Sequence, residues 1–196
     1  MKFWRAFVLA WLATTLAGCG INTIPTYDEQ VKAAWSQVEN QYQRRADLVP
    51  NLVNTVKGFA AQEREVLVEV TEARAKVGSI QAGEEILNDP EKFQQFEQAQ
   101  NRLGSALQRL MVVVERYPEL KSNQNFLALQ SQLEGTENRI AVARRDYIEA
   151  VRQYNTEIRT FPGRIWHTLL YSDLEQRENF EATTENAEQA PSVNFE

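Results

Sequence analysis

The sequence is poor in glycine, proline, cysteine and histidine, and each shortage excludes a class of protein. Glycine and proline number 8 and 6 among 196 residues, too few for the many tight turns of a short-stranded β-sandwich or barrel. The single cysteine cannot form an internal disulfide, and one cysteine with one histidine cannot build the usual zinc sites. Most metal chemistry and most nucleophilic catalysis are thereby excluded, and we expect no cofactor.

An excess of positive charge is also missing. The chain has 21 Lys and Arg against 27 Asp and Glu, a formal net charge of -6. Nucleic-acid binding needs a basic surface, so we expect no nucleic-acid partner. Hydrophobic residues make up 43% and charged residues 24% of the chain. This composition excludes a wholly disordered protein and is sufficient for one domain with its own core.

The N-terminus has the features of a bacterial lipoprotein signal. Two basic residues precede an apolar run over residues 6–18, which is the order of a signal peptide. As a helix this run would be roughly 20 Å long, shorter than the ~30 Å apolar core of a membrane. It ends in Leu-Ala-Gly before Cys19, which is similar to a lipobox. The pattern predicts a signal peptide over 1–18, a lipid on Cys19 and a tether over 19–26; the alternative is an uncleaved membrane anchor.

Four long segments carry apolar residues at alternating spacings of three and four, which is typical of amphipathic α-helices. No segment shows sustained alternation of apolar and polar residues, so we expect no β-sheet. The fold class is therefore predicted to be all-α, an antiparallel four-helix bundle over residues 27–180 with short links. The helices are expected at residues 27–45, 49–78, 90–117 and 122–159.

The boundary between the first two helices has two interpretations. Asp47 can cap a helix and Pro50 is tolerated in a first helical turn, which favours a fold-back over 46–48. The apolar stripe nevertheless continues in phase through Pro50 if Arg45 faces the core. A single kinked helix over residues 27–78 is then the alternative. We prefer the fold-back, because it lets the first helix cover apolar surface on the others.

The C-terminal part is expected to be a short helix and a tail. Ile165, Trp166, Leu169 and Leu170 follow a Pro-Gly pair at helical spacing, which indicates a short amphipathic helix. Residues 181–196 carry four Glu and no basic residue, a composition typical of a flexible acidic extension. Two apolar residues of this tail can still dock as a short extended strand and are candidate partner contacts: Val193 and Phe195.

Several motifs occur in one order along most of the chain. The run Arg-Arg-Ala-Asp-Leu-Val-Pro-Asn-Leu-Val occupies residues 44–53 and is followed by Thr-Val-Lys-Gly-Phe-Ala over 55–60. Glu-Asn-Arg-Ile follows at 137–140, Tyr-Asn at 154–155 and Ala-Pro-Ser-Val-Asn-Phe at 190–195. With these motifs the sequence resembles the LemA family from about residue 27 to residue 195.

The resemblance implies a four-helix bundle outside the cytoplasm, held to the inner or outer membrane of the cell envelope and facing the periplasm. It implies no established enzymatic activity. Genes for TPM-domain proteins or HtpX-type membrane proteases often lie beside those of family members, which suggests envelope quality control and a partner of that kind. The chain departs from the family at Gln62, where a histidine is common, and in its short apolar N-terminus.

Four polar residues lie on otherwise apolar stripes and form the candidate polar seam: Glu63, Gln100, Glu137 and Arg144. The first interpretation is that they pair inside the bundle, because unpaired buried charge is costly. The alternatives are a position in water at the rim of the bundle and a polar pocket for a ligand. If they pair, we expect Glu63 or Glu137 to lie within salt-bridge distance of Arg144 or Arg74.

A second polar cluster, Arg44, Arg45 and Asp47, lies at the predicted corner between the first two helices. Helix capping and a solvated turn explain it, and the alternative is contact with a partner protein at that end of the bundle. His167 is a poor metal candidate, because a di-iron site in a bundle needs two histidines with several glutamates. We therefore expect no metal site.

Two function classes remain. The first is a non-enzymatic, membrane-anchored scaffold or binding module that presents its helices or tail to another envelope protein or to a second copy. The second is an envelope hydrolase that uses paired carboxylates on the bundle surface, about 5–10 Å apart as in glycosidases. We prefer the binding module, because short links leave few loops from which to build a cleft.

Overall fold

The computed structural model describes residues 20–80 and 83–180, and this part of the chain is all-α with no strand. This part of the chain has six α-helices and one 3-10 helix. In chain order they are α2 (Thr23–Phe59), α3 (Arg64–Gly78), the 3-10 helix η1 (Glu84–Asn88), α4 (Pro90–Val114), α5 (Pro118–Lys121), α6 (Gln124–Arg159) and α7 (Gly163–Leu170). The predicted signal peptide with Cys19, and the tail over 181–196 with Val193 and Phe195, lie outside the described residues.

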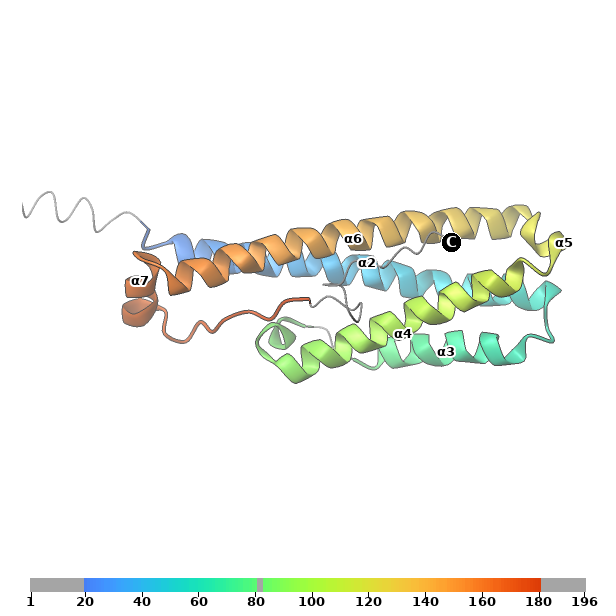
Figure 1. Cartoon of the computed structure of the whole chain (residues 1–196), viewed down its shortest axis with the longest axis horizontal. Helices are drawn as coiled ribbons and strands as arrows, with labels where there is room; N and C mark the ends of the chain where they lie inside the picture. The colour runs from blue at the N-terminus through green and yellow to red at the C-terminus, as the bar shows by residue number, and fades with distance from the viewer. Residues whose placement is uncertain (1–19, 81–82, 181–196) are drawn as a thin grey trace, which may run out of the picture.

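The four long helices form the predicted antiparallel bundle (Figure 1). α2 and α6 lie side by side along the molecule, and α3 and α4 pack on one another as a second pair beneath α2. Successive long helices run in opposite directions, as expected for short connections. α5 lies at one end of the bundle, whereas α7 and the first turn of α2 lie at the other. No described helix has the length and apolar composition needed to cross a membrane.

The boundary between the first two predicted helices differs from the expectation. α2 continues unbroken through Pro50, so the preferred fold-back over 46–48 is wrong. The alternative is right in passing through Pro50 and wrong in its extent, because α2 ends at Phe59 and a separate helix, α3, covers 64–78. Proline has no amide hydrogen to donate to the carbonyl of residue 46, four residues earlier. Arg74 of α3 supplies the missing donor, because its Nε donates to the Ala46 carbonyl at 3.0 Å. The chain turns later than expected, over residues 60–63.

The other helix ends agree with the capping signals. Asp89 stands before α4, and its carboxylate accepts a hydrogen bond from the Lys92 amide at 3.1 Å. Asn123 caps α6 in the same way, accepting from the Phe126 amide at 3.1 Å. Side-chain acceptors at these positions satisfy amides that lack partners within the helix. The short helix expected after Pro162 is α7.

Two groups of buried side chains fill the interior. The aromatic cluster lies between the N-terminal half of α2 and the C-terminal half of α6, with Trp35 at its centre. Four rings surround Trp35 at centroid distances of 5.2 to 6.3 Å, those of Phe93, Phe96, Tyr147 and Phe180. The aliphatic cluster fills the other half of the bundle, and its most deeply buried members include Leu52, Leu103 and Leu110.

Candidate functional site

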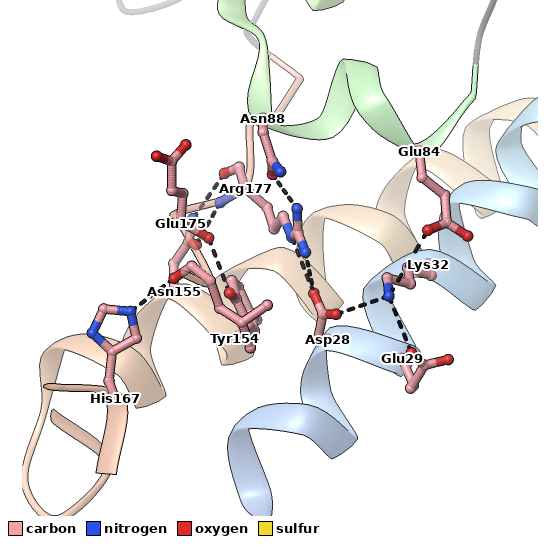
Figure 2. A network of polar contacts seen from close by, with 11 residues as sticks. Asp28, Glu29, Lys32, Glu84, Asn88, Tyr154, Asn155, His167, Glu175 and Arg177 are labelled. Atoms are coloured by element: carbon pink, nitrogen blue, oxygen red, sulfur yellow. Dashed lines mark hydrogen bonds and ion pairs between the residues drawn. The ribbon is translucent and has the colours of Figure 1, made fainter. Parts of the chain in front are cut away.

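A buried ion pair fastens the C-terminal segment, residues 171–180, to the first long helix (Figure 2). The Nε and Nη2 atoms of Arg177 donate to Asp28 of α2, with the Nε contact at 3.1 Å. Both side chains are only 6% exposed. Lys32 Nζ lies 3.1 Å from the other carboxylate oxygen of Asp28, and Asn88 of η1 accepts from Arg177 Nη1. Three separate parts of the chain, α2, η1 and the C-terminal segment, meet at this network.

Side chains of α6 hold the backbone of the same segment. The hydroxyls of Tyr147 and Tyr154 donate to two of its carbonyls at 2.7 and 2.9 Å. Asn155 bonds both backbone groups of Arg177, accepting from its amide at 3.0 Å and donating to its carbonyl at 2.9 Å. Burial raises the pKa of Tyr147 and raises the pKa of Tyr154 to about 12. Both hydroxyls are therefore protonated donors at neutral pH.

The guanidinium of Arg45 joins three helices at the level between the two core clusters. Its Nη2 donates to the carbonyl and to the side-chain Oε1 of Gln100 on α4, at 2.9 and 2.7 Å. Its Nη1 lies 3.3 Å from Glu137 on α6. Arg45 and Gln100 are buried, whereas Glu137 is about half exposed. Two members of the predicted seam, Gln100 and Glu137, are thus brought together by Arg45.

The predicted corner cluster is consequently divided. Because α2 continues through residues 46–48, Arg45 points into the core and is not part of a solvated turn. Arg44 and Asp47 are exposed on the outer face of α2, where Asp47 accepts a hydrogen bond from Gln43 at 2.8 Å. Asp47 does not cap a helix, because no helix begins there. A partner contact at Arg44 and Asp47 stays a prediction.

The remaining seam residues pair differently from the expectation. Arg144 contacts Glu97 of α4 at 3.1 Å, and its guanidinium lies 4.2 Å from the centroid of the Phe180 ring. Glu137 pairs with Arg45, and Arg74 donates to the Ala46 carbonyl. The expected ion pairs of Arg144 or Arg74 with Glu63 or Glu137 are therefore not formed.

Glu63 lies apart from the rest of the seam, in the turn between α2 and α3. Its carboxylate accepts a hydrogen bond from the Tyr117 hydroxyl at 2.7 Å and lies 3.1 Å from Arg116 Nη2. Gln62, the position where the family commonly has histidine, donates to the same Tyr117 hydroxyl at 2.9 Å. These contacts fasten the 60–63 turn to the residues that directly follow α4, and they do not form an interior site.

The sequence matches the model of the LemA family over residues 34–195. The chain belongs to the LemA family. The motifs that carry the resemblance also supply the polar networks of the bundle. The 44–53 run contains Arg45, the 137–140 run contains Glu137, and the Tyr-Asn pair is Tyr154 and Asn155.

Curated relatives include proteins with two different names. The chain is 31% identical over 182 residues to magnetosome protein MamQ 2 of Paramagnetospirillum magneticum, covering 84% of this chain and 64% of that protein. It is 28% identical over 159 residues to magnetosome protein MamQ of Magnetospirillum gryphiswaldense, with coverage of 72% and 58%. Protein LemA of Metamycoplasma hominis is 23% identical over 140 residues, with coverage of 71% and 60%. The LemA-family chain therefore spans less than two thirds of these relatives.

Sequence reasoning missed the Asp28–Arg177 pair of this LemA bundle. A signal for Asp28 was present, because it lies four residues after Ile24 and three before Val31 on the buried stripe of α2. Arg177 has no such signal, because the segment that carries it is not helical and has no periodicity to read. Only the folded chain identifies the two as partners.

Four surface cavities of about 330 to 540 Å³ bear on the hydrolase alternative. Each has one carboxylate among its lining residues, respectively Glu39, Glu72, Asp146 and Glu29. Burial, with a smaller contribution from Glu85, raises the pKa of Glu39. A glycosidase-type reaction needs two carboxylates facing one cleft, an arrangement that none of these four cavities provides.

Metal ligands are likewise dispersed. Over residues 20–80 and 83–180, no group of three or more His, Cys, Asp or Glu side chains is placed to hold a metal ion. His167 instead contacts the C-terminal segment, with its Nε2 2.7 Å from the Leu174 carbonyl oxygen.

Proposed function

We propose that this LemA-family chain is a non-enzymatic, membrane-anchored scaffold or binding module of the bacterial cell envelope. The observation that carries the proposal is that its buried and partly buried polar side chains bond to one another between separate elements. Three such groups each join separate elements: Asp28 with Arg177, Arg45 with Gln100 and Glu137, and Arg144 with Glu97. Their polar atoms bond to other parts of the same chain. Pairs of this kind specify the register of neighbouring helices. They support a rigid body that presents surfaces.

The shape of the bundle supports the same proposal. α2 has 37 residues and α6 has 36, so each extends about 55 Å at 1.5 Å per residue. Anchored through its N-terminal residues, such a rod holds its far end well away from the membrane surface. The partner we propose is another envelope protein, a membrane protease or a TPM-domain protein by family analogy, with envelope quality control as the process served.

The lipid anchor is tested by labelling cells with an alkyne fatty acid. Wild-type protein should become labelled and should float with membranes, whereas Cys19→Ala should lose the label, because the thiol of Cys19 is the proposed acceptor. An Asn22→Ala variant, which keeps the thiol and changes an exposed side chain with no capping hydrogen bond, is the matched control for expression. Unchanged labelling of Cys19→Ala would contradict lipidation at this residue.

The binding role is tested by placing a photo-crosslinking amino acid at exposed positions in living cells. Val112 on α4 and Val142 on α6 are large apolar residues facing solvent, and Leu110, two residues from Val112, is fully buried and serves as the unreactive control. A scaffold should yield a discrete adduct with one envelope protein from at least one exposed position. A complete scan of the exposed faces of α2, α3, α4 and α6 without any adduct would overturn the proposal.

A further inference from the structure

α7 leaves an apolar surface uncovered at one end of the bundle. Ile165, Leu169 and Leu170 on this helix are 46%, 67% and 53% exposed, and Phe161 just before it is 82% exposed. We call these four residues the α7 patch. Ten large apolar side chains are exposed among the described residues, and four of them belong to this one short stretch. Exposed apolar residues that cluster in this way, unlike single exposed ones, mark a site of interaction with a protein or a membrane.

The α7 patch lies at the end of the bundle where the described chain begins (Figure 1). A methyl group placed on the Cα of Gly20 would lie 3.9 Å both from Pro162 Cγ and from Trp166 Nε1. Gly20 directly follows Cys19, the residue through which we propose that the chain is attached to a membrane. An anchored chain therefore holds the α7 patch within a residue or two of the lipid surface.

The charges of this stretch differ from those of the whole chain. The protein has a net charge of -6, yet residues 159–172 contain no Asp or Glu. Arg159 and Arg164, both exposed, are the basic residues of the stretch besides His167. Long basic side chains reach lipid phosphates while neighbouring apolar residues enter the acyl region. Trp166, which is half-buried beside the patch, is of the residue type enriched at the membrane–water interface.

We propose that α7 is an interfacial helix that docks on the bilayer to which the chain is anchored, with the α7 patch inserted at the boundary between headgroups and acyl chains. The occupant of the patch is thus a phospholipid surface. This inference rests on the proposed membrane anchoring and adds a second contact to it. A flexible tether alone leaves the bundle free to tilt, whereas a tether together with a docked helix sets the direction in which the far end points.

The experiment uses the full chain reconstituted through its own N-terminus into vesicles of phosphatidylcholine and phosphatidylglycerol in a 7:3 ratio. A nitroxide is attached to Leu169→Cys and, as a matched control, to Val112→Cys at the opposite end of the bundle. The unsubstituted chain, labelled in parallel, measures any reaction at Cys19. Both substituted residues are exposed, so both variants should retain the wild-type helicity and melting temperature.

Accessibility of the nitroxide to oxygen and to a water-soluble nickel chelate is then compared at the two sites. Oxygen concentrates in the acyl region and the chelate stays in water, so the oxygen-to-nickel ratio should be several-fold higher at residue 169 than at residue 112. Adding Ile165→Ser and Leu170→Ser to the labelled chain should lower the ratio toward that of residue 112, because these changes remove the apolar surface that inserts.

Each other outcome overturns a defined part of the inference. If the protein floats with the vesicles but residue 169 is as accessible to the chelate as residue 112, docking of α7 is wrong and the anchor stands. If both probes are excluded from residue 169, a protein surface covers the patch, either the tail of the chain or a second copy. If the protein does not float, the anchoring and the docking fail together.

Discussion

Asp28 and Arg177 lie 149 residues apart in the sequence and face each other in the interior of the bundle. A buried ion pair is costly to desolvate, and replacing both partners by apolar residues is often neutral. Removing only one partner is different, because it leaves an uncompensated charge in a poorly solvated place. The pair therefore acts as a fastening between α2 and the C-terminal segment.

We expect Asp28→Asn to lower the free energy of unfolding by about 3 kcal/mol, because Arg177 loses its counter-ion. The measurement is urea unfolding followed by circular dichroism. Asp146→Asn is the control, since Asp146 is an exposed carboxylate paired with Arg145 on the surface, and its loss should cost less than about 0.5 kcal/mol. Equal costs for the two variants would show that the buried pair has no special role.

The tyrosine hydroxyls that hold the C-terminal segment predict a loss of stability at alkaline pH. Burial raises the pKa of Tyr154 to about 12, above the value near 10 expected in the unfolded chain. Below pH 10 both states keep the proton, so this contribution to stability is complete there. As the pH rises from about 10 through 12, the unfolded state releases its proton first and the free energy of unfolding falls.

This pH dependence is measured by urea unfolding at pH 8, 10 and 11. Tyr154→Phe should cost about 1 kcal/mol at pH 8, through the hydrogen bond lost to the Glu175 carbonyl, and should show a shallower decline above pH 10 than the wild type. An identical alkaline decline in the two proteins would mean that Tyr154 does not contribute to it.

At the scale of the helices, α2 shows how a neighbouring element can keep a helix continuous through a proline. Pro50 removes a hydrogen bond to the Ala46 carbonyl, and Arg74 from α3 replaces it. The same arginine therefore links α3 to the middle of α2, beyond the apolar contacts that the two helices share. Continuity of α2 in turn directs Arg45 into the core instead of leaving it at a corner.

A double-mutant cycle at Pro50 and Arg74 tests this account. Arg74→Ala should lower the free energy of unfolding by about 1 kcal/mol in the wild type and by less in a Pro50→Ala background, where the new amide can donate to the Ala46 carbonyl. Arg64→Ala, at the exposed start of α3, should have a cost that does not depend on residue 50. Additive effects of the Pro50 and Arg74 changes would refute the coupling.

Much of this helical architecture could be predicted from the sequence, and the exceptions share a cause. The start of α4 at Pro90 behind Asp89 was predicted because capping is decided by adjacent residues. The fold-back before Pro50 was wrong because the donor that compensates for this proline, Arg74, lies 28 residues along the chain from the Ala46 carbonyl to which it donates. In the polar seam, the burial of Gln100 agreed with the expected interior position, but its partner Arg45 had been assigned to the corner.

At the scale of the whole molecule, the two core clusters are joined by α2, α4 and α6, each of which contributes buried side chains to both. Arg45, with Gln100 and Glu137, bridges three helices at the level between the clusters. Because three long helices are shared by the two clusters, we expect the bundle to unfold as one cooperative unit despite its length.

Hydrogen exchange can test this cooperativity. Leu110→Ala removes a fully buried side chain from the aliphatic cluster and should cost about 3 kcal/mol. Exchange of the most protected amides around Trp35, in the aromatic cluster, should then accelerate about 100-fold. Val112→Ala, at a position on the same helix that is 70% exposed, is the control and should leave exchange nearly unchanged. Acceleration confined to the aliphatic half would show that the two halves open independently.

Local sequence was enough to establish an all-α LemA-family bundle, because helical periodicity, capping and family motifs all depend on residues close together in the chain. The tertiary structure was needed for the continuity of α2 through Pro50 and for the joining of Asp28 to Arg177, because in both cases the partner comes from a distant segment. It also placed Trp166 of α7 beside Gly20. Antiparallel packing of the helices brings these distant residues together, and no local sequence pattern predicts which of them will meet.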